Sequence, residues 1–201
     1  MKSTIYGTPI LSTVMHYMAR FLLYSAGWQV KGIRPQVKKY ILIAFPHTSN
    51  WDFYYTLLIA FSLKIKLYAL AKKELFRPPF GPLMGWLGMI PVDRSQSNNK
   101  VAAIIETFNT HDALALAIPP SGTRGKVMVW KSGFYHIAHG AGIPIVMAYV
   151  DYGRKVGGLG PLITPSGDMA KDMVGILEFY RGITGKHPQK DVDAPFDPAG
   201  R

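Results

Sequence analysis

Short apolar runs and stretches of helix-spaced apolar residues alternate along the chain. Helical spacing occurs over about 50–63, 97–110, 131–139 and 168–180, and each stretch predicts a helix. Strands that alternate with helices are typical of an α/β domain with a largely parallel sheet, buried on both faces. Functional residues of such sheets gather at the carboxyl ends of the strands. The apolar runs that predict buried strands are 40–45, 67–71, 89–92, 113–118 and 143–150.

Other parts of the chain depart from this alternation. A glycine-rich, extended stretch over 154–163 is interpreted as an edge strand. Residues 9–29 are mostly apolar but contain His16 and Arg20, which makes them too polar for a transmembrane span. We expect an amphipathic helix there, lying on a membrane or packed on the domain. The chain is therefore divided into an N-terminal amphipathic helical segment over 1–30, one α/β domain over 31–185 and a loosely held, proline-rich tail over 186–201.

Composition narrows the possible chemistry. The 201 residues are 48% apolar and 17% charged, as expected for one folded domain with a full core. The absence of cysteine excludes disulfides, thiolate metal sites and a cysteine nucleophile. Nothing in the sequence calls for a metal or another cofactor.

The positive charge is concentrated in the first half of the chain. The net charge is +11, and residues 1–100 hold 13 Lys and Arg against three acids. Such a half either forms a solvated basic face or binds a polyanion. Its cations are interleaved with apolar and aromatic residues, and no nucleic-acid-binding motif is visible. We therefore expect this half to bind an anionic membrane surface and not a nucleic acid. The interleaved cations are Lys64, Lys66, Lys72, Lys73 and Arg77.

A histidine and an aspartate stand at the junction of the first predicted strand and the next helix. His47 follows the strand over 40–45, and Asp52 falls in the first turn of the helix. Asp52 could accept a hydrogen bond from one ring nitrogen of His47, leaving the other to take a proton from a hydroxyl. A histidine beside a strand is also commonly structural, so this spacing alone does not decide.

Two further polar blocks follow predicted strands. The charged pair Asp93 and Arg94 comes directly after the run over 89–92, and Arg94 could clamp a phosphate. The loop over 119–126 follows the strand over 113–118. Its backbone N–H groups around Gly122, its threonine hydroxyl and its two cations could form an anion-binding nest. Lys131 is predicted at the start of the next helix. Each block, taken alone, is better explained as an ordinary turn.

Together these blocks resemble the glycerolipid acyltransferase family typified by 1-acyl-sn-glycerol-3-phosphate acyltransferase. The resemblance runs over about residues 41–150. The family's His-x4-Asp block is matched by His47 and Asp52. The matches to its other blocks are Gly88, Asp93 and Arg94 for Gly-x-x-x-x-Asp-Arg; Pro120, Gly122, Thr123 and Arg124 for Pro-Glu-Gly-Thr-Arg; Lys131 for the Lys-x-Gly stretch; and 143–147 for the apolar strand with an internal proline.

The resemblance implies a single α/β domain of the glycerol-3-phosphate acyltransferase type, with a mostly parallel central sheet flanked by helices. It implies that His47 deprotonates a lysolipid hydroxyl while Asp52 holds its tautomer, and that the acyl donor is acyl-CoA or an acyl carrier protein. No metal or cofactor is implied, and the expected place of action is the cytoplasmic face of the cell membrane, as a peripheral or monotopic protein. The residues expected to bind substrate are Arg94, Ser121, Gly122, Thr123, Arg124 and Lys131.

One departure from the family leaves alternatives open. Ser121 stands where the family has glutamate, so it loses length and charge at a position thought to shape the acceptor site. The acceptor could therefore be a lyso-aminolipid or a glycolipid, or the chain could bind lipid without catalysis. A serine hydrolase is disfavoured because Ser49, Ser121 and Ser132 lie outside any Gly-x-Ser-x-Gly elbow. His136 and His139 have no acidic or thiol neighbour in sequence and are interpreted as structural.

Overall fold

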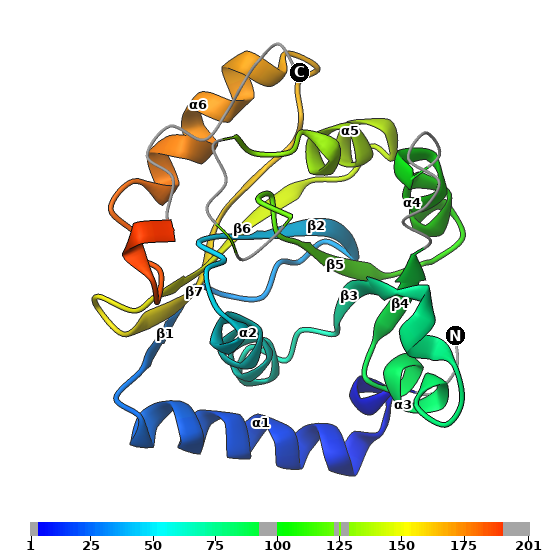
Figure 1. Ribbon diagram of the computed structural model, residues 1–201, viewed down its shortest axis with the longest axis vertical. Helices are drawn as coiled ribbons and strands as arrows, with labels where there is room; N and C mark the ends of the chain where they lie inside the picture. Colours follow the sequence, from blue (N-terminus) through cyan, green and yellow to red (C-terminus); the bar gives the residue numbers. More distant parts are fainter. Residues whose placement is uncertain (1–3, 93–99, 123–124, 126–128, 191–201) are drawn as a thin grey trace.

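The computed structural model of the chain describes residues 4–92, 100–122, 125 and 129–190. Within these residues one sheet has the strand order β1-β7-β6-β2-β5-β3-β4 (Figure 1). The strands are β1 (Gln29–Lys31), β2 (Lys39–Ala44), β3 (Leu67–Lys72), β4 (Met89–Val92), β5 (Leu114–Ile118), β6 (Ile145–Asp151) and β7 (Val156–Ile163).

The sheet is mostly parallel, as predicted. Strands β6, β2, β5, β3 and β4 run in one direction, whereas β7 is antiparallel to β6 and β1 is parallel to β7. The central strand β2 is buried on both sides: Ile41 and Ile43 belong to one apolar cluster, and Tyr40 and Leu42 belong to another. This double burial explains the unbroken apolar run of its sequence.

The prediction of an edge strand over 154–163 is wrong. Strand β7 lies inside the sheet, between β6 and β1, and the edge is formed by β1. The glycines allow this close pairing, because a Cβ atom on Gly158 would lie 1.9 Å from the carbonyl oxygen of Lys31. Strand β1 was not predicted because its three residues, between Trp28 and Gly32, carry no recognisable period.

Helices cover both faces of the sheet. In Figure 1, α4, α5 and α6 lie on one side, and α1, α2 and α3 lie on the other. The helix predicted from Lys131 begins two residues later, at Gly133. Short 3-10 helices occur at Ile5–Gly7, Lys73–Phe76 and Pro188–Lys190. The α-helices are α1 (Pro9–Ser25), α2 (Asn50–Ser62), α3 (Gly81–Trp86), α4 (Lys100–Asn109), α5 (Gly133–Gly140) and α6 (Met169–Tyr180).

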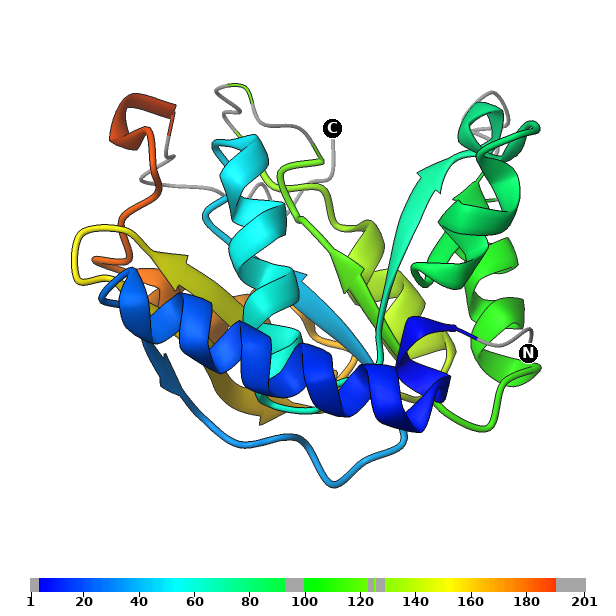
Figure 2. The same cartoon turned by 90° about the horizontal axis from the view of Figure 1, so that it is seen from below.

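Helix α1 forms an additional layer outside α2 (Figure 2). Its inner side packs on the domain: Ala19 and Leu23 are buried with residues of α2, and His16 Nδ1 lies 3.1 Å from the carbonyl oxygen of Phe61. Its outer side keeps an apolar stripe exposed. In the part of the chain that the structure describes, no helix has the length and apolarity needed to cross a membrane.

Candidate active site

The junction between β2 and α2 places His47 and Asp52 at the carboxyl edge of the sheet. Strand β2 ends at Ala44, and α2 begins at Asn50, so His47 lies in the short connection. Ser49 caps the helix: its Oγ accepts a hydrogen bond from the Trp51 N–H at 3.2 Å. Asp52 completes this capping box, and its negative charge at the helix N-terminus is favourable.

Both oxygens of the Asp52 carboxylate are held by hydrogen bonds. Oδ2 accepts from the backbone N–H groups of Thr48 and Ser49 at 2.6 and 2.7 Å. Oδ1 accepts from the hydroxyl of Tyr152 at 2.9 Å. The Asp52 residue is only 3% exposed. The carboxylate is therefore buried, oriented and multiply hydrogen-bonded.

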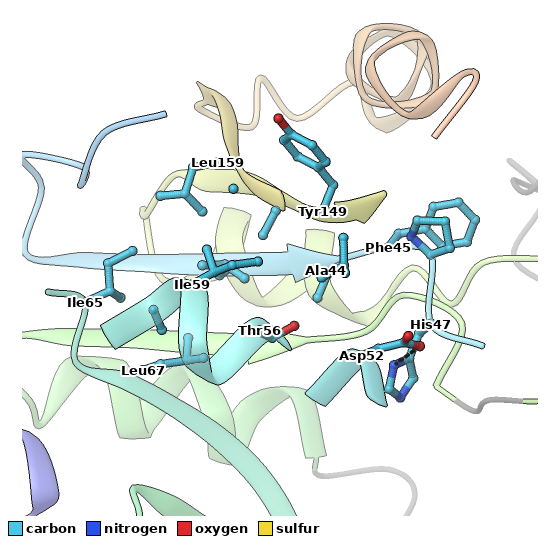
Figure 3. A pocket seen from close by; sticks show the side chains of 16 residues that line it. Ala44, Phe45, His47, Asp52, Thr56, Ile59, Ile65, Leu67, Tyr149 and Leu159 are labelled. Carbon is cyan, nitrogen blue, oxygen red and sulfur yellow. Dashed lines mark ion pairs between the residues drawn. The ribbon is translucent and has the colours of Figure 1, made fainter. Parts of the chain in front are cut away.

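His47 faces this carboxylate and also the solvent. Its Nδ1 lies 3.5 Å from Asp52 Oδ2, and its side chain is 22% exposed (Figure 3). The distance is at the outer limit of a hydrogen bond, and such contacts in catalytic sites tighten when substrate binds. When Nδ1 carries the proton and donates to Asp52, Nε2 is left as an acceptor on the other side of the ring.

The electrostatics favour an ionised aspartate. Burial raises the pKa of Asp52, but hydrogen bonds from His47, Ser49, Tyr152 and Thr48 outweigh burial and leave this pKa below its ordinary value. Burial and the nearby Asp52 charge raise the pKa of Tyr152, so its hydroxyl stays a donor. A fixed negative charge behind a partly exposed imidazole is the arrangement of a general base.

An apolar pocket leads away from the His47–Asp52 pair, between α2 and the sheet. In Figure 3 the pair stands at one end, and Ile65 and Leu67 stand at the other. The empty volume is about 430 Å³, part of which is open to solvent. Its lining consists of Leu42, Ala44, Phe45, Pro46, His47, Asp52, Thr56, Ile59, Ala60, Ile65, Leu67, Ala148, Tyr149, Val150, Gly158 and Leu159.

The turn after β5 lies beside this junction. Strands β2 and β5 pair in parallel up to Ile43 and Ile118, so their following loops leave the same edge of the sheet. The two loops also touch, because the rings of Phe45 and Trp130 have centroids 4.8 Å apart. The structure thus brings the first and third predicted blocks together. Asp93, Arg94, Thr123 and Arg124 lie outside the described residues.

Ser121, Gly122 and Lys131 form one compact turn. Ser121 is buried, and Gly122 has φ +66°, a left-handed conformation that glycine adopts without strain. The Lys131 N–H donates to the carbonyl oxygen of Pro120 at 2.9 Å, and its ammonium would be 3.3 Å from a Cβ on Gly122. Lys131 therefore belongs to this turn rather than to α5, because its N–H is used here.

The sequence reasoning missed the contacts from the C-terminal third of the chain. Tyr152 directly follows β6, so the rule that site residues follow parallel strands could have found it. The segment after α6 follows no parallel strand, yet it contacts the connection between β2 and α2 that holds His47. The His187 N–H donates to Thr48 Oγ1 at 3.1 Å, and Lys186 Nζ lies 4.6 Å from the centroid of the Trp51 ring.

The fold and the site together point to one class of enzyme. A mostly parallel α/β sheet carries a His-x4-Asp pair at a strand end, beside an apolar pocket. The model of the Acyltransferase family matches residues 28–151, and the chain belongs to this family. The predicted family membership is therefore confirmed.

Two comparisons with individual proteins agree. The chain is 28% identical over 130 residues to 1-acyl-sn-glycerol-3-phosphate acyltransferase of Haemophilus influenzae. The matched region covers 60% of this chain and 52% of the relative. The chain thus spans about half the length of that relative. The crystal structure of the 1-acyl-sn-glycerophosphate acyltransferase PlsC from Thermotoga maritima matches with a TM-score of 0.60 and 17% identity, over 91% of this chain and 83% of that one. This likeness confirms the fold class.

Proposed function

We propose that the protein is a membrane-associated O-acyltransferase. It moves a fatty acyl group from acyl-CoA or an acyl carrier protein to the hydroxyl of a lysophospholipid such as 1-acyl-glycerol-3-phosphate. The observation that carries the proposal is the His47–Asp52 pair at the mouth of an apolar pocket. Family membership and the name of the Haemophilus influenzae relative support the same reaction class.

The proposed mechanism uses His47 as general base. Nε2 takes the proton of the acceptor hydroxyl as its oxygen attacks the thioester carbonyl. The new C–O bond forms, the C–S bond breaks, and the thiolate leaves with the proton that His47 carried. Asp52 remains ionised throughout and stabilises the imidazolium, as its lowered pKa supports.

The apolar pocket is proposed to hold the fatty acyl chain. Beyond His47, Asp52, Thr56 and Tyr149 its lining is apolar, which suits a hydrocarbon chain. An acyl chain lying between α2 and the sheet places its carbonyl carbon at the mouth, next to His47. The pocket is proposed to be closed at the end where Ile65 and Leu67 are buried, which limits chain length (Figure 3).

Shortening the side chain at the closed end tests this assignment. We expect Ile65→Ala to change the ratio of transfer rates for long and short donors by roughly tenfold in favour of the longer one, the effect of about one or two methylene groups in an apolar pocket. The measurement is a competition assay with acyl donors of different length. Ile145→Ala is the matched control, since Ile145 is fully buried on the opposite face of the sheet. An equal change in both variants would contradict the assignment.

The acceptor phosphate is proposed to bind at the turn after β5. Lys131 supplies a cation beside the exposed backbone of Gly122. Arg94, Thr123 and Arg124 remain predicted partners outside the described residues. Ser121, in place of the family's glutamate, is buried within the same turn and keeps the alternative acceptors open.

A panel of acceptors separates these alternatives. Purified protein is incubated with labelled acyl-CoA and 1-acyl-glycerol-3-phosphate, a lyso-aminolipid or a lysoglycolipid. The proposal expects the label in the phosphatidic acid product. If the label appears only in the product of another acceptor, that acceptor replaces the lysophospholipid in the proposed reaction. If the protein binds lipid but transfers label to no acceptor, it is a non-catalytic lipid-binding protein.

The outer stripe of α1 supports membrane association. Its exposed apolar side chains recur every three or four residues, while the inner side is occupied by the domain. Exposed cations at Arg20, Lys31 and Arg34 on and after this helix suit anionic headgroups. The stripe consists of Ile10, Val14, Tyr17, Met18, Phe21 and Tyr24.

A charge placed in the stripe should release the protein from vesicles. We expect Phe21→Asp to weaken binding to vesicles containing anionic lipid by about tenfold or more, since burying one aromatic side chain contributes about 1.5–3 kcal/mol. Vesicle flotation measures this. Val174→Asp is the control, because Val174 is 69% exposed on α6, across the sheet from α1. Equal binding of both variants and the wild type would exclude α1 as the docking surface.

A further inference from the structure

We propose that Tyr152 is a positioning residue of the acyl-transfer site, whose hydroxyl fixes the orientation of Asp52 and through it the imidazole of His47. This inference rests on the proposed function, because the reaction that Tyr152 assists is the proposed acyl transfer. Tyr152 lies 100 residues beyond Asp52, outside the His-x4-Asp block, and donates to Oδ1 at 2.9 Å.

The two oxygens of Asp52 are held from different parts of the fold. Oδ2 is bound by the Thr48 and Ser49 N–H groups of its own loop and faces His47. Among the described residues, Tyr152 is the one hydrogen-bond donor to Oδ1. Rotation of the carboxylate about its Cβ–Cγ bond is thus opposed at both oxygens. Without the hydroxyl, Oδ1 loses a buried partner, and the contact with His47, already 3.5 Å long, can lengthen.

Tyr152 is itself held rigidly. Its ring packs edge-on against Trp28, with centroids 5.2 Å apart, and against Tyr55 at 5.7 Å. Its backbone N–H donates to the carbonyl oxygen of Thr184 at 2.9 Å. Because the ring and backbone are fixed by packing, little side-chain entropy is lost in orienting the hydroxyl. Trp28 follows the end of α1, so this helix supports the site through Tyr152.

The Tyr152 hydroxyl keeps its proton, and can donate a hydrogen bond, over the whole pH range in which the protein works. Burial and the charge of Asp52 raise the pKa of Tyr152, which keeps its proton in place. In the described part of the chain, the titratable groups that face Asp52 are His47 from its own loop and Tyr152 from the connection after β6. Tyr55 faces Tyr152 from α2. Loss of the Tyr152 donor should therefore raise the pKa of Asp52.

Tyr152→Phe removes the hydroxyl and keeps the ring. We expect kcat to fall roughly tenfold to a hundredfold, the range caused by misplacement of a catalytic group, with KM for donor and acceptor changed less than about twofold. The carbon-13 signal of the Asp52 carboxyl, assigned with Asp52→Asn, should titrate at higher pH than in the wild type. Tyr55→Phe is the control, because it removes a hydroxyl from the same aromatic cluster without touching Asp52; it should leave both readouts unchanged.

An unchanged Asp52 titration, or an unchanged kcat, would overturn the proposal. A loss of thermal stability alone, with the titration unmoved, would assign Tyr152 a structural role only. If Tyr152→Phe does not fold, the wild-type chain made with 3-fluorotyrosine replaces it: the stronger donor should lower the pKa of Asp52. If the wild type transfers no acyl group, the proposed function fails, while the Asp52 titration still decides whether Tyr152 holds the carboxylate.

Discussion

Replacement of His47 with alanine is expected to lower acyl transfer by roughly 10²–10⁴-fold, the contribution of general-base catalysis. The imidazole is the group that can take the acceptor proton, since Asp52 is buried behind it. The fold should persist, because the His47 side chain is partly exposed and fills no core position. Initial rates of product formation from labelled acyl-CoA measure the loss, and circular dichroism checks the fold.

His136→Ala is the matched control for this variant. His136 is exposed on α5 and packs edge-on against Tyr135, away from the pair. It should transfer acyl groups at the wild-type rate. Free fatty acid released by the His47→Ala protein as fast as the wild type transfers acyl groups would point to a separate nucleophile and contradict the role of His47.

Asp52→Asn is expected to lower both activity and stability. An asparagine cannot accept at both oxygens, so either the Thr48 and Ser49 N–H groups or the Tyr152 hydroxyl lose their acceptor. The buried unsatisfied groups should cost about 1–3 kcal/mol of unfolding free energy at pH 7. Loss of the carboxylate charge also removes the partner of the imidazolium, so the transfer rate should fall by roughly 10²–10⁴-fold, as for a base that loses its orienting group.

The stability loss of Asp52→Asn should depend on pH in a defined direction. The pKa of Asp52 in the folded state lies below its ordinary value of 3.8, so the ionised carboxylate stabilises the fold above that value. The stabilisation is lost as pH falls through the lowered folded-state pKa. Urea unfolding should therefore show the full deficit from about pH 5 to 8 and a shrinking deficit below about pH 4.

Asp168→Asn is the control for this pH dependence. Asp168 caps α6 at the surface through the Lys171 N–H, and asparagine caps helices about as well as aspartate. This variant should keep its activity and nearly all of its stability. A deficit of Asp52→Asn that grows as the pH falls would contradict the account of the Asp52 carboxylate.

The helices and strands that could be predicted from sequence are those whose own residues show an apolar run, an apolar period or a helix cap. Strand β2 and helix α2 have an unbroken apolar run followed by a Ser49 cap, and both lie within a residue or two of the predicted bounds. The rule that functional residues follow parallel strands then located His47 correctly at the edge of the sheet.

The features that were missed depend on partners distant in sequence. Strand β1 exists because the glycines of β7 let it pair closely, and nothing in its three residues indicates this. The hydrogen bond from Tyr152 to Asp52 and the contact of His187 with Thr48 span 100 and 139 residues. Such contacts follow from the folded arrangement, and the sequence hints at them only through the place of Tyr152 directly after β6.

The decisive measurement for the proposed reaction is the release of free CoA from acyl-CoA with and without a hydroxyl acceptor. Acyl transfer that depends on His47 predicts that the wild-type protein releases free CoA only when 1-acyl-glycerol-3-phosphate or another hydroxyl acceptor is present, with one thiol for each diacyl product. It also predicts that His47→Ala releases almost none. Release of thiol at the same rate without any acceptor, or no release with any acceptor in the panel, would contradict it.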